Sequence, residues 1–272
     1  MDDPFGEELR QSAYALDSTM IDLCLAMFPW ARFRQRKGAV KMHTLLDLHG
    51  NVPTFVWISD GKLADVKILD QLLPEAGSFY VMDRGYVDFE RLHRFTSASA
   101  FLVTRTKDNV QLKRLTSRRK ESGDGVMSDQ IVVLATADSR KHYPDKLRRI
   151  RYHDADNDRY LVFLTNNFDL PALTIARLYK ARWQVELQHL RIKAFYGTSQ
   201  NAVKTQIWIA ITIYVLIAII KKELGLSVSI YQILQVVSVT VFERVPILQV
   251  LQSEEPGENL GEFSNQLNLF TL

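Results

Sequence analysis

The sequence is nearly free of cysteine, because Cys24 is the only one among its 272 residues. A single thiol excludes an internal disulfide framework and any zinc site built from several thiolates. The six histidines, at positions 43, 49, 93, 142, 153 and 189, show no His-x3-His spacing, so no zinc-binding motif is recognised. We expect Cys24 to lie buried as a small apolar side chain.

Long hydrophobic runs are also missing. The longest, Ile207–Ile220, has 14 residues with Thr212 inside it, whereas a membrane span needs about 20 residues. We therefore expect this run to form a buried helix. The first residues are acidic and polar, which is not typical of a secretory signal, and the predicted location is the cytoplasm.

Charge of one sign does not dominate, since 34 Lys and Arg stand against 31 Asp and Glu and the net charge is +3. A hydrophobic share of 47% and a charged share of 24% are typical of a globular protein and exclude disorder of the whole chain. The cations gather at 32–41, 113–120 and 146–151. Such local patches suit contact with phosphate backbones, and an ordinary solvated surface is the alternative.

Apolar patterning predicts a mixed sheet with helices packed on it. Three strands joined as hairpins are followed by strands that alternate with helices, which is typical of an α/β fold of mixed rather than doubly wound type. The predicted strands are 14–21, 39–47, 54–59, 79–82 and 101–104. Asp65 is expected to cap a short helix that carries Ile68, Leu69 and Leu72.

The second half of the chain begins with a segment that is predicted to be a loop, residues 107–129, because it is polar and basic. A β-rich stretch follows, with strands expected at 130–135, 147–152 and 160–165. A long helix is then expected to begin near Pro171, followed by apolar helices over 203–222 and 228–242.

Four side chains on the helix after Pro171 are spaced to share one face. Tyr179, Arg182, Glu186 and Lys193 lie at offsets that, at about 100° per residue, fall within an arc of about 60°. An exposed row of ion pairs is the simpler alternative, because Arg182 and Glu186 are four residues apart.

Two further carboxylates occupy positions in or next to predicted strands, where an acidic side chain is unusual. Asp17 is inside the first predicted strand, where aspartate is disfavoured, and Asp83 ends the fourth. A carboxylate in an apolar strand needs a cation, hydrogen-bond donors or a metal. Together with Glu186, these acids could hold two Mg²⁺ ions for phosphoryl transfer.

This ordered set of residues resembles the DDE transposases of bacterial insertion sequences, in the branch with a Tyr-x2-Arg-x3-Glu-x6-Lys signature. Asp17 in Leu-Asp-Ser-Thr is similar to the first acid of that family, and Asp83 in Asp-Arg-Gly-Tyr to the second. The resemblance covers residues from about 12 to about 245.

The resemblance implies an RNase H-like catalytic core with a β-rich insertion between the fifth strand and the catalytic helix. The implied domains are the first part of the core at 1–105, the insertion at 106–168, the catalytic and C-terminal helices at 169–252 and a polar tail at 253–272. Family members usually carry an N-terminal DNA-binding domain, which this sequence is expected to lack.

The resemblance also implies cleavage at the ends of a mobile element and attack of the freed 3′-hydroxyl on target DNA. By this resemblance, Asp17, Asp83 and Glu186 hold two Mg²⁺ ions, for which Mn²⁺ can substitute. Residues implied to hold DNA near the scissile phosphate are Tyr179, Arg182, Lys193 and Arg84. The implied partners are double-stranded DNA, as terminal inverted repeats and target, and a second copy of the chain on paired ends in the bacterial nucleoid.

Two alternatives stay open on the sequence. A truncated, inactive remnant would only bind DNA or partner transposase, and a stand-alone RNase H-like nuclease would cleave without transposition. The segment after Glu186 bears on the first, because Lys193 is either the true signature lysine or follows a deletion of about six residues. Such a deletion would rotate a continuous helix by about 240°.

Overall fold

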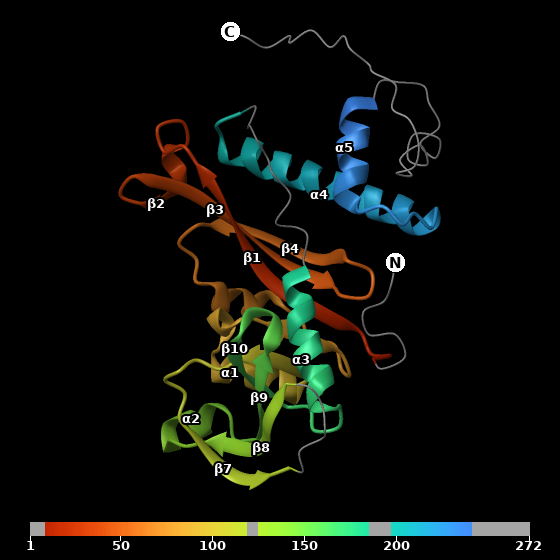
Figure 1. Cartoon of the computed structure of the whole chain (residues 1–272). Coiled ribbons are helices and arrows are strands. Elements are labelled where there is room, and N and C mark those ends of the chain that lie inside the picture. Colours follow the sequence, from red (N-terminus) through yellow and green to blue (C-terminus); the bar gives the residue numbers. More distant parts are fainter. Residues whose placement is uncertain (1–8, 119–124, 185–196, 241–272) are drawn as a thin grey trace.

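The computed structural model describes residues 9–118, 125–184 and 197–240. One mixed sheet of ten strands runs through them, in the order β2-β3-β1-β5-β6-β10-β9-β8-β7, with β4 paired to β3 (Figure 1). The strands are β1 (Ala13–Leu23), β2 (Arg32–Arg34), β3 (Lys37–Asp47), β4 (Val52–Asp60), β5 (Phe79–Met82), β6 (Phe101–Arg105), β7 (Leu112–Ser117), β8 (Val126–Leu134), β9 (Leu147–Asp154) and β10 (Arg159–Thr165).

The first half of the sheet has the expected RNase H-like arrangement. β1, β3 and β4 form an antiparallel meander, while β5 and β6 pair in parallel on the other side of β1. All five strands predicted in this half are present, which confirms a mixed α/β fold.

The β-rich segment extends this same sheet. β10 pairs antiparallel with β6, and β9, β8 and β7 follow outward from it. The expectation of a loop over 107–129 was wrong in two places, because β7 lies inside that range and β8 begins at Val126. Most side chains of β7 are polar and exposed, so it is an edge strand without the apolar alternation that predicts a strand. The domain boundaries given above stay predictions.

Helices cover the two faces of the sheet. The α-helices are α1 (Phe89–Ser97), α2 (Ala137–His142), α3 (Ala172–Ala181), α4 (Gln200–Glu223) and α5 (Ile230–Thr240). Short 3₁₀ helices are η2 (Pro29–Ala31), η3 (Asp65–Gln71), η4 (Arg84–Tyr86), η5 (Ala155–Asn157) and η6 (Arg182–Gln184). Helix α3 lies over the middle of the sheet, and α4 crosses the end formed by β3 and β4 (Figure 1).

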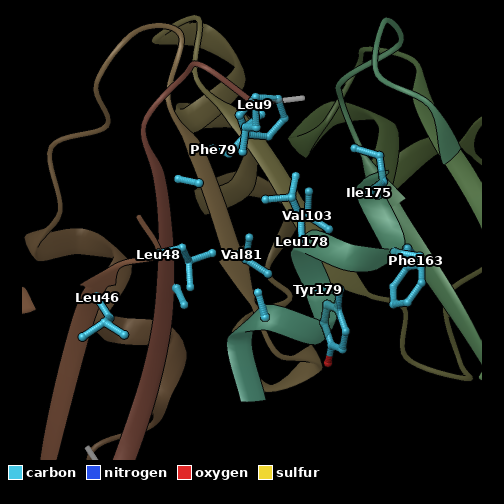
Figure 2. Close-up of a cluster of buried hydrophobic side chains, with 14 of the residues drawn as sticks. Leu9, Leu46, Leu48, Phe79, Val81, Val103, Phe163, Ile175, Leu178 and Tyr179 are labelled. Carbon is cyan, nitrogen blue, oxygen red and sulfur yellow. The ribbon is translucent and has the colours of Figure 1, made fainter. Parts of the chain in front are cut away.

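Successive side chains along the strands point to opposite faces of the sheet, and each face has an apolar core. Ala15 and Val81 pack with Ile175 of α3 and Ile217 of α4. Figure 2 shows part of this cluster, in which β5, β6 and β10 meet α3. The neighbouring strand positions, including Leu16, pack on the opposite face with residues of η3 and α1. The site described below lies on the α3 face.

Helix α4 is less buried than the sequence predicts. It is the one helix in the described parts of the chain that is long and apolar enough to cross a membrane, and 33% of its most apolar window is buried. The side chains of Trp208 and Leu216 are 47% and 53% exposed. The expectation for Cys24 was also wrong, because the thiol is exposed just beyond the end of β1.

Candidate active site

Two carboxylates lie where the pairing of two neighbouring parallel strands ends. β1 and β5 are paired as far as Leu16 and Met82, so Asp17 and Asp83 both follow the last paired positions. Strand alternation places Asp17 on the same face as Ala15, which is the face covered by α3. The side chain of Asp17 is 23% exposed.

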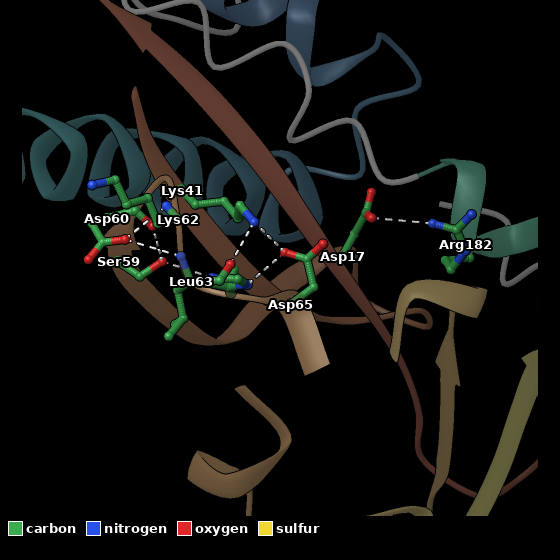
Figure 3. Close-up of polar contacts among 9 residues, drawn as sticks. Asp17, Lys41, Ser59, Asp60, Lys62, Leu63, Asp65 and Arg182 are labelled. Atoms are coloured by element: carbon green, nitrogen blue, oxygen red, sulfur yellow. Dashed lines mark hydrogen bonds and ion pairs between the residues drawn. The ribbon is translucent and has the colours of Figure 1, made fainter. Parts of the chain in front are cut away.

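Helix α3 and the turn after it bring one partner to each acid. The hydroxyl of Tyr179 donates to Asp83 Oδ1 over 2.8 Å, across 96 positions of sequence. Arg182 Nη1 lies 3.3 Å from Asp17 Oδ1, across 165 positions (Figure 3). Figure 2 shows the ring of Tyr179 within the core and its hydroxyl at the margin. Four predicted site residues therefore meet in one place.

The pKa values of the two acids are shifted in opposite directions. Burial is the largest influence on each and works to raise the pKa. For Asp17 burial prevails over the charge of Arg182, so its pKa lies above the ordinary value, and Asp83 raises it further. For Asp83 the hydrogen bond from Tyr179 and nearby positive charges outweigh burial, so its pKa is lowered. The two carboxylates repel each other, and a cation between them would stabilise their charged forms.

Arg182 is almost fully buried, with a side chain 8% exposed. Its guanidinium carbon lies 5.3 Å from the ring centroid of Tyr179. Among the described residues, no acceptor bonds its buried Nε. A buried guanidinium with a donor to spare is suited to an anionic oxygen, because Arg binds phosphate through several N–H groups.

A cation that sequence reasoning missed also faces the acids. Arg105 ends β6, the strand next to β5, and its charge is one of the smaller influences that lower the pKa of Asp83. Arg105 directly follows a predicted strand, and this position could have indicated a site residue, because the carboxyl ends of parallel strands meet at one edge of a sheet. The predicted DNA contact Arg84 is exposed at the start of η4, next to Asp83.

This chain is similar to proteins of a known family. The family model described as "Transposase DDE domain" matches residues 8–216, more than half of the chain. The chain belongs to the transposase DDE domain family. The putative transposase y4zB of Sinorhizobium fredii is 37% identical over 78% of this chain and 62% of its own length. The probable transposase for insertion sequence element IS5377 of Geobacillus stearothermophilus is 32% identical over 74% of this chain and 55% of its own length.

The DDE-domain chain thus spans about three fifths of the length of the curated relatives that it matches. A solved structure titled as a piggyBac transposase synaptic complex with hairpin DNA is similar over 91% of this chain and 59% of its own. Its TM-score is 0.46 and its sequence identity is 11%.

Two predicted residues of the DDE-domain site, Glu186 and Lys193, lie outside the described residues. Within the described parts of the chain, no three acidic, histidine or cysteine side chains are grouped closely enough to hold a metal ion. Asp17 and Asp83 offer hard carboxylate oxygens, the ligand type that Mg²⁺ prefers, and their mutual repulsion suits a bound cation. This donor set therefore fits the expected metal, with Glu186 as the predicted third ligand.

Of the other acids, Asp47 and Asp60 stabilise turns. Asp47 accepts from the N–H groups of His49 and Gly50, and Asp60 from those at the start of the next turn. The cap role of Asp65 was wrong, because η3 has Ala64 as its N-cap and no side-chain cap bond. The carboxylate of Asp65 instead pairs with Lys41, which is buried on β3.

Proposed function

We propose that the chain is the catalytic domain of an insertion-sequence transposase, which cleaves DNA strands and joins them to a target with divalent metal ions. The observation that carries this proposal is the meeting of Asp17 and Asp83 with Tyr179 and Arg182. Membership of the transposase DDE domain family supports it, and so do relatives named as transposases.

The proposed metal ligands are Asp17, Asp83 and Glu186, around two Mg²⁺ ions. Bound ions supply positive charge to the attacking and leaving oxygens of the phosphoryl transfer. In this proposal Tyr179 orients the carboxylate of Asp83 through its hydrogen bond, and the charge of Arg182 partly offsets the effect of burial on the pKa of Asp17.

The positive side chains have a second proposed task, which is to hold the DNA backbone. Arg182 offers N–H groups of its guanidinium to a phosphate oxygen, while Arg84 and Lys193 contact phosphates nearby. Arg105 joins this set by its place beside Asp83. We also propose terminal inverted repeats and target DNA as substrates, a homodimer on paired ends, and a location at the nucleoid in the cytoplasm.

Cleavage of a linear DNA that carries the element's own end tests the proposal. The wild-type chain is compared in Mg²⁺ and in EDTA, and with the variants Asp83→Ala and Glu186→Ala. Metal-dependent nicking at the element end, lost in both variants, is the expected result.

Two other outcomes would favour the alternatives. A folded chain that does not nick in Mg²⁺ or Mn²⁺ would be a remnant that only binds. Nicking that is metal-dependent but equally fast on DNA without the element end, and never followed by joining to a target, would indicate a stand-alone nuclease.

A further inference from the structure

A partly buried ion pair lies on the face of the sheet opposite α3. Lys41 Nζ is 2.9 Å from Asp65 Oδ1 and 2.8 Å from the carbonyl oxygen of Leu63 (Figure 3). The side chain of Lys41 is 11% exposed and that of Asp65 33%. The pair joins β3 to the first residue of η3, so it fixes the position of η3 on the sheet.

This pair lies behind the candidate site. Lys41 and His43 alternate with Met42, whose side chain belongs to the α4 face, so the pair and the site occupy opposite sides of the same strands. A Cβ on Gly85 would lie 4.0 Å from the second carboxylate oxygen of Asp65. The carboxylate therefore lies near Gly85 of η4, the turn that directly follows Asp83, and η3 itself contacts η4.

Two buried polar atoms of the same region have no hydrogen-bond partner among the described residues. One is His43 Nδ1, which lies 4.0 Å from Asp65 Oδ1, and the other is the hydroxyl oxygen of Tyr86. The ring of Tyr86 is buried with Ile68 and Leu69 of η3. A buried polar atom left without a partner costs about 1–3 kcal/mol.

Stability alone does not account for this cluster. Replacing a buried ion pair by apolar side chains of similar volume is often neutral, or stabilising by about 1–4 kcal/mol. An ion pair does, however, fix geometry, since Lys41 holds the carboxylate of Asp65 in one direction through a short bond.

We propose that the Lys41–Asp65 ion pair positions the acids of the site, because it holds the turn after Asp83 against β3. Strand β3 is paired with β1, which carries Asp17. The inference rests on the proposed function for its link to metal binding. Neither residue contacts the reacting atoms, and both act through η3 and η4 on Asp83.

The first test measures how much Mg²⁺ the full chain needs for half-maximal cleavage. Asp65→Asn and Lys41→Met should raise that concentration by about 10-fold or more, as losses of residues that support metal ligands do. The dissociation constant for DNA should change by less than about two-fold, since the outer phosphate contacts remain. Lys41→Arg keeps the charge and should restore the wild-type requirement.

A matched control comes from the same short helix. Asp70 pairs with Arg91 over 2.8 Å at the exposed end of η3, so Asp70→Asn removes a surface ion pair of the same element. It should leave the Mg²⁺ requirement unchanged.

The second test needs no cleavage. Amide hydrogen exchange is followed at Tyr86 and Val87, whose N–H groups donate to the carbonyl oxygens of Asp83 and Arg84. Exchange should become faster in Asp65→Asn and stay unchanged in Asp70→Asn. If Asp65→Asn does not fold, the same two measurements on Asp65→Glu test the proposal. This substitution displaces the carboxylate by one methylene.

Unchanged exchange at these amides would overturn the proposal. Faster exchange with an unchanged Mg²⁺ requirement would also overturn it, because the pair would then serve the fold alone. If wild-type protein does not cleave DNA at all, the proposed function fails, whereas the exchange experiment still decides whether the pair positions the turn.

Discussion

The hydroxyl of Tyr179 donates a hydrogen bond to Asp83. Burial raises the pKa of Tyr179 to about 12, so the phenol keeps its proton throughout the neutral range. A neutral phenol next to a carboxylate of lowered pKa can only donate to it. The hydrogen bond therefore fixes the direction in which Asp83 presents its other oxygen.

Tyr179→Phe removes this donor and keeps the ring in the core. We expect cleavage to slow by about 10- to 100-fold, which corresponds to about 1.4–2.7 kcal/mol of activation free energy, because Asp83 loses its fixed orientation. Rates of strand cleavage in Mg²⁺ measure the effect. Tyr214→Phe is the control, since that hydroxyl donates to the carbonyl of Asn51 away from the acids, and an equal loss there would contradict the assignment.

His43 makes the fold sensitive to acid. Burial is the main reason that its pKa falls from 6.5 to about 4, and nearby Asp65 opposes that fall. Between these two values the unfolded chain binds a proton that the folded chain does not. The free energy of unfolding should therefore decrease as pH falls from about 6.5 to about 4, by up to about 3 kcal/mol.

Urea unfolding at pH 7.5 and pH 5 measures this loss. His43→Gln, which keeps a polar side chain near the hydroxyl of Ser59, should reduce the difference between the two pH values. His142→Gln changes an exposed ring at the end of α2 and should leave it as in the wild type. If the His43 variant retains the full difference, another group is responsible.

At the scale of elements, the β9–β10 hairpin holds the end of α3. Lys180 Nζ lies 2.6 Å from Asp154 and 2.8 Å from Asp156, and both acids belong to the hairpin end. Arg159, at the start of β10, lies over the ring of Trp183 at 4.3 Å from its centroid. These contacts flank Arg182 on both sides, so the hairpin orients the cation that binds Asp17.

Lys180→Met should weaken this connection. Asp154 is fully buried and would lose its closest cation, but Lys180 is partly exposed and Arg159 stays in place. We therefore expect a loss of about 1–3 kcal/mol in the free energy of unfolding. Urea denaturation measures it, with Lys113→Met on the exposed edge strand β7 as the control. Equal stability of the two variants would refute the role of the hairpin.

The elements also show how far sequence reasoning reaches. Strands with apolar cores were predicted well, and Phe79–Met82 was correct to the residue because all four side chains are buried. β7 was missed because it exists through its pairing with β8 rather than through its own polar residues. Helix spacing placed Tyr179 and Arg182 on one face, but not the acids that each of them contacts.

The pairing of Lys41 with Asp65 could not be predicted from the sequence, for a related reason. The two residues are 24 positions apart, and Asp65 stands beside a turn, where a capping role explains an acid without any distant partner. Only the folded arrangement of β3 and η3 brings the two charges together. The functions of Glu186 and Lys193 stay predictions.

The molecule as a whole exposes an apolar surface along α4. Five large side chains of this helix are between 44% and 53% exposed: Trp208, Ile209, Ile213, Leu216 and Ile219. A cavity of about 340 Å³ lies between this helix and β4, lined in part by Phe55 and Val215. Exposed apolar surface of this kind favours association with other chains.

Replacing Ile209 by Lys and Ile213 by Glu should reduce self-association of the purified chain at about 100 µM without unfolding it, because both side chains point outward. Light scattering gives the mean mass, and circular dichroism checks the fold. Thr205→Lys, at another exposed position of α4, tests for a general effect of charge. A mean mass that stays the same in all three proteins would contradict this expectation.

The contact between Arg182 and Asp17 joins residues that are synthesised far apart in time, so it can form only late in translation. At a synthesis rate of about 5–20 residues per second, Asp17 is synthesised roughly 8–33 s before Arg182. During that interval the strand has no α3 to cover it, and neither acid has its helix partner. A translation product that stops before residue 179 would carry both aspartates but neither Tyr179 nor Arg182, the helix partners of the two acids.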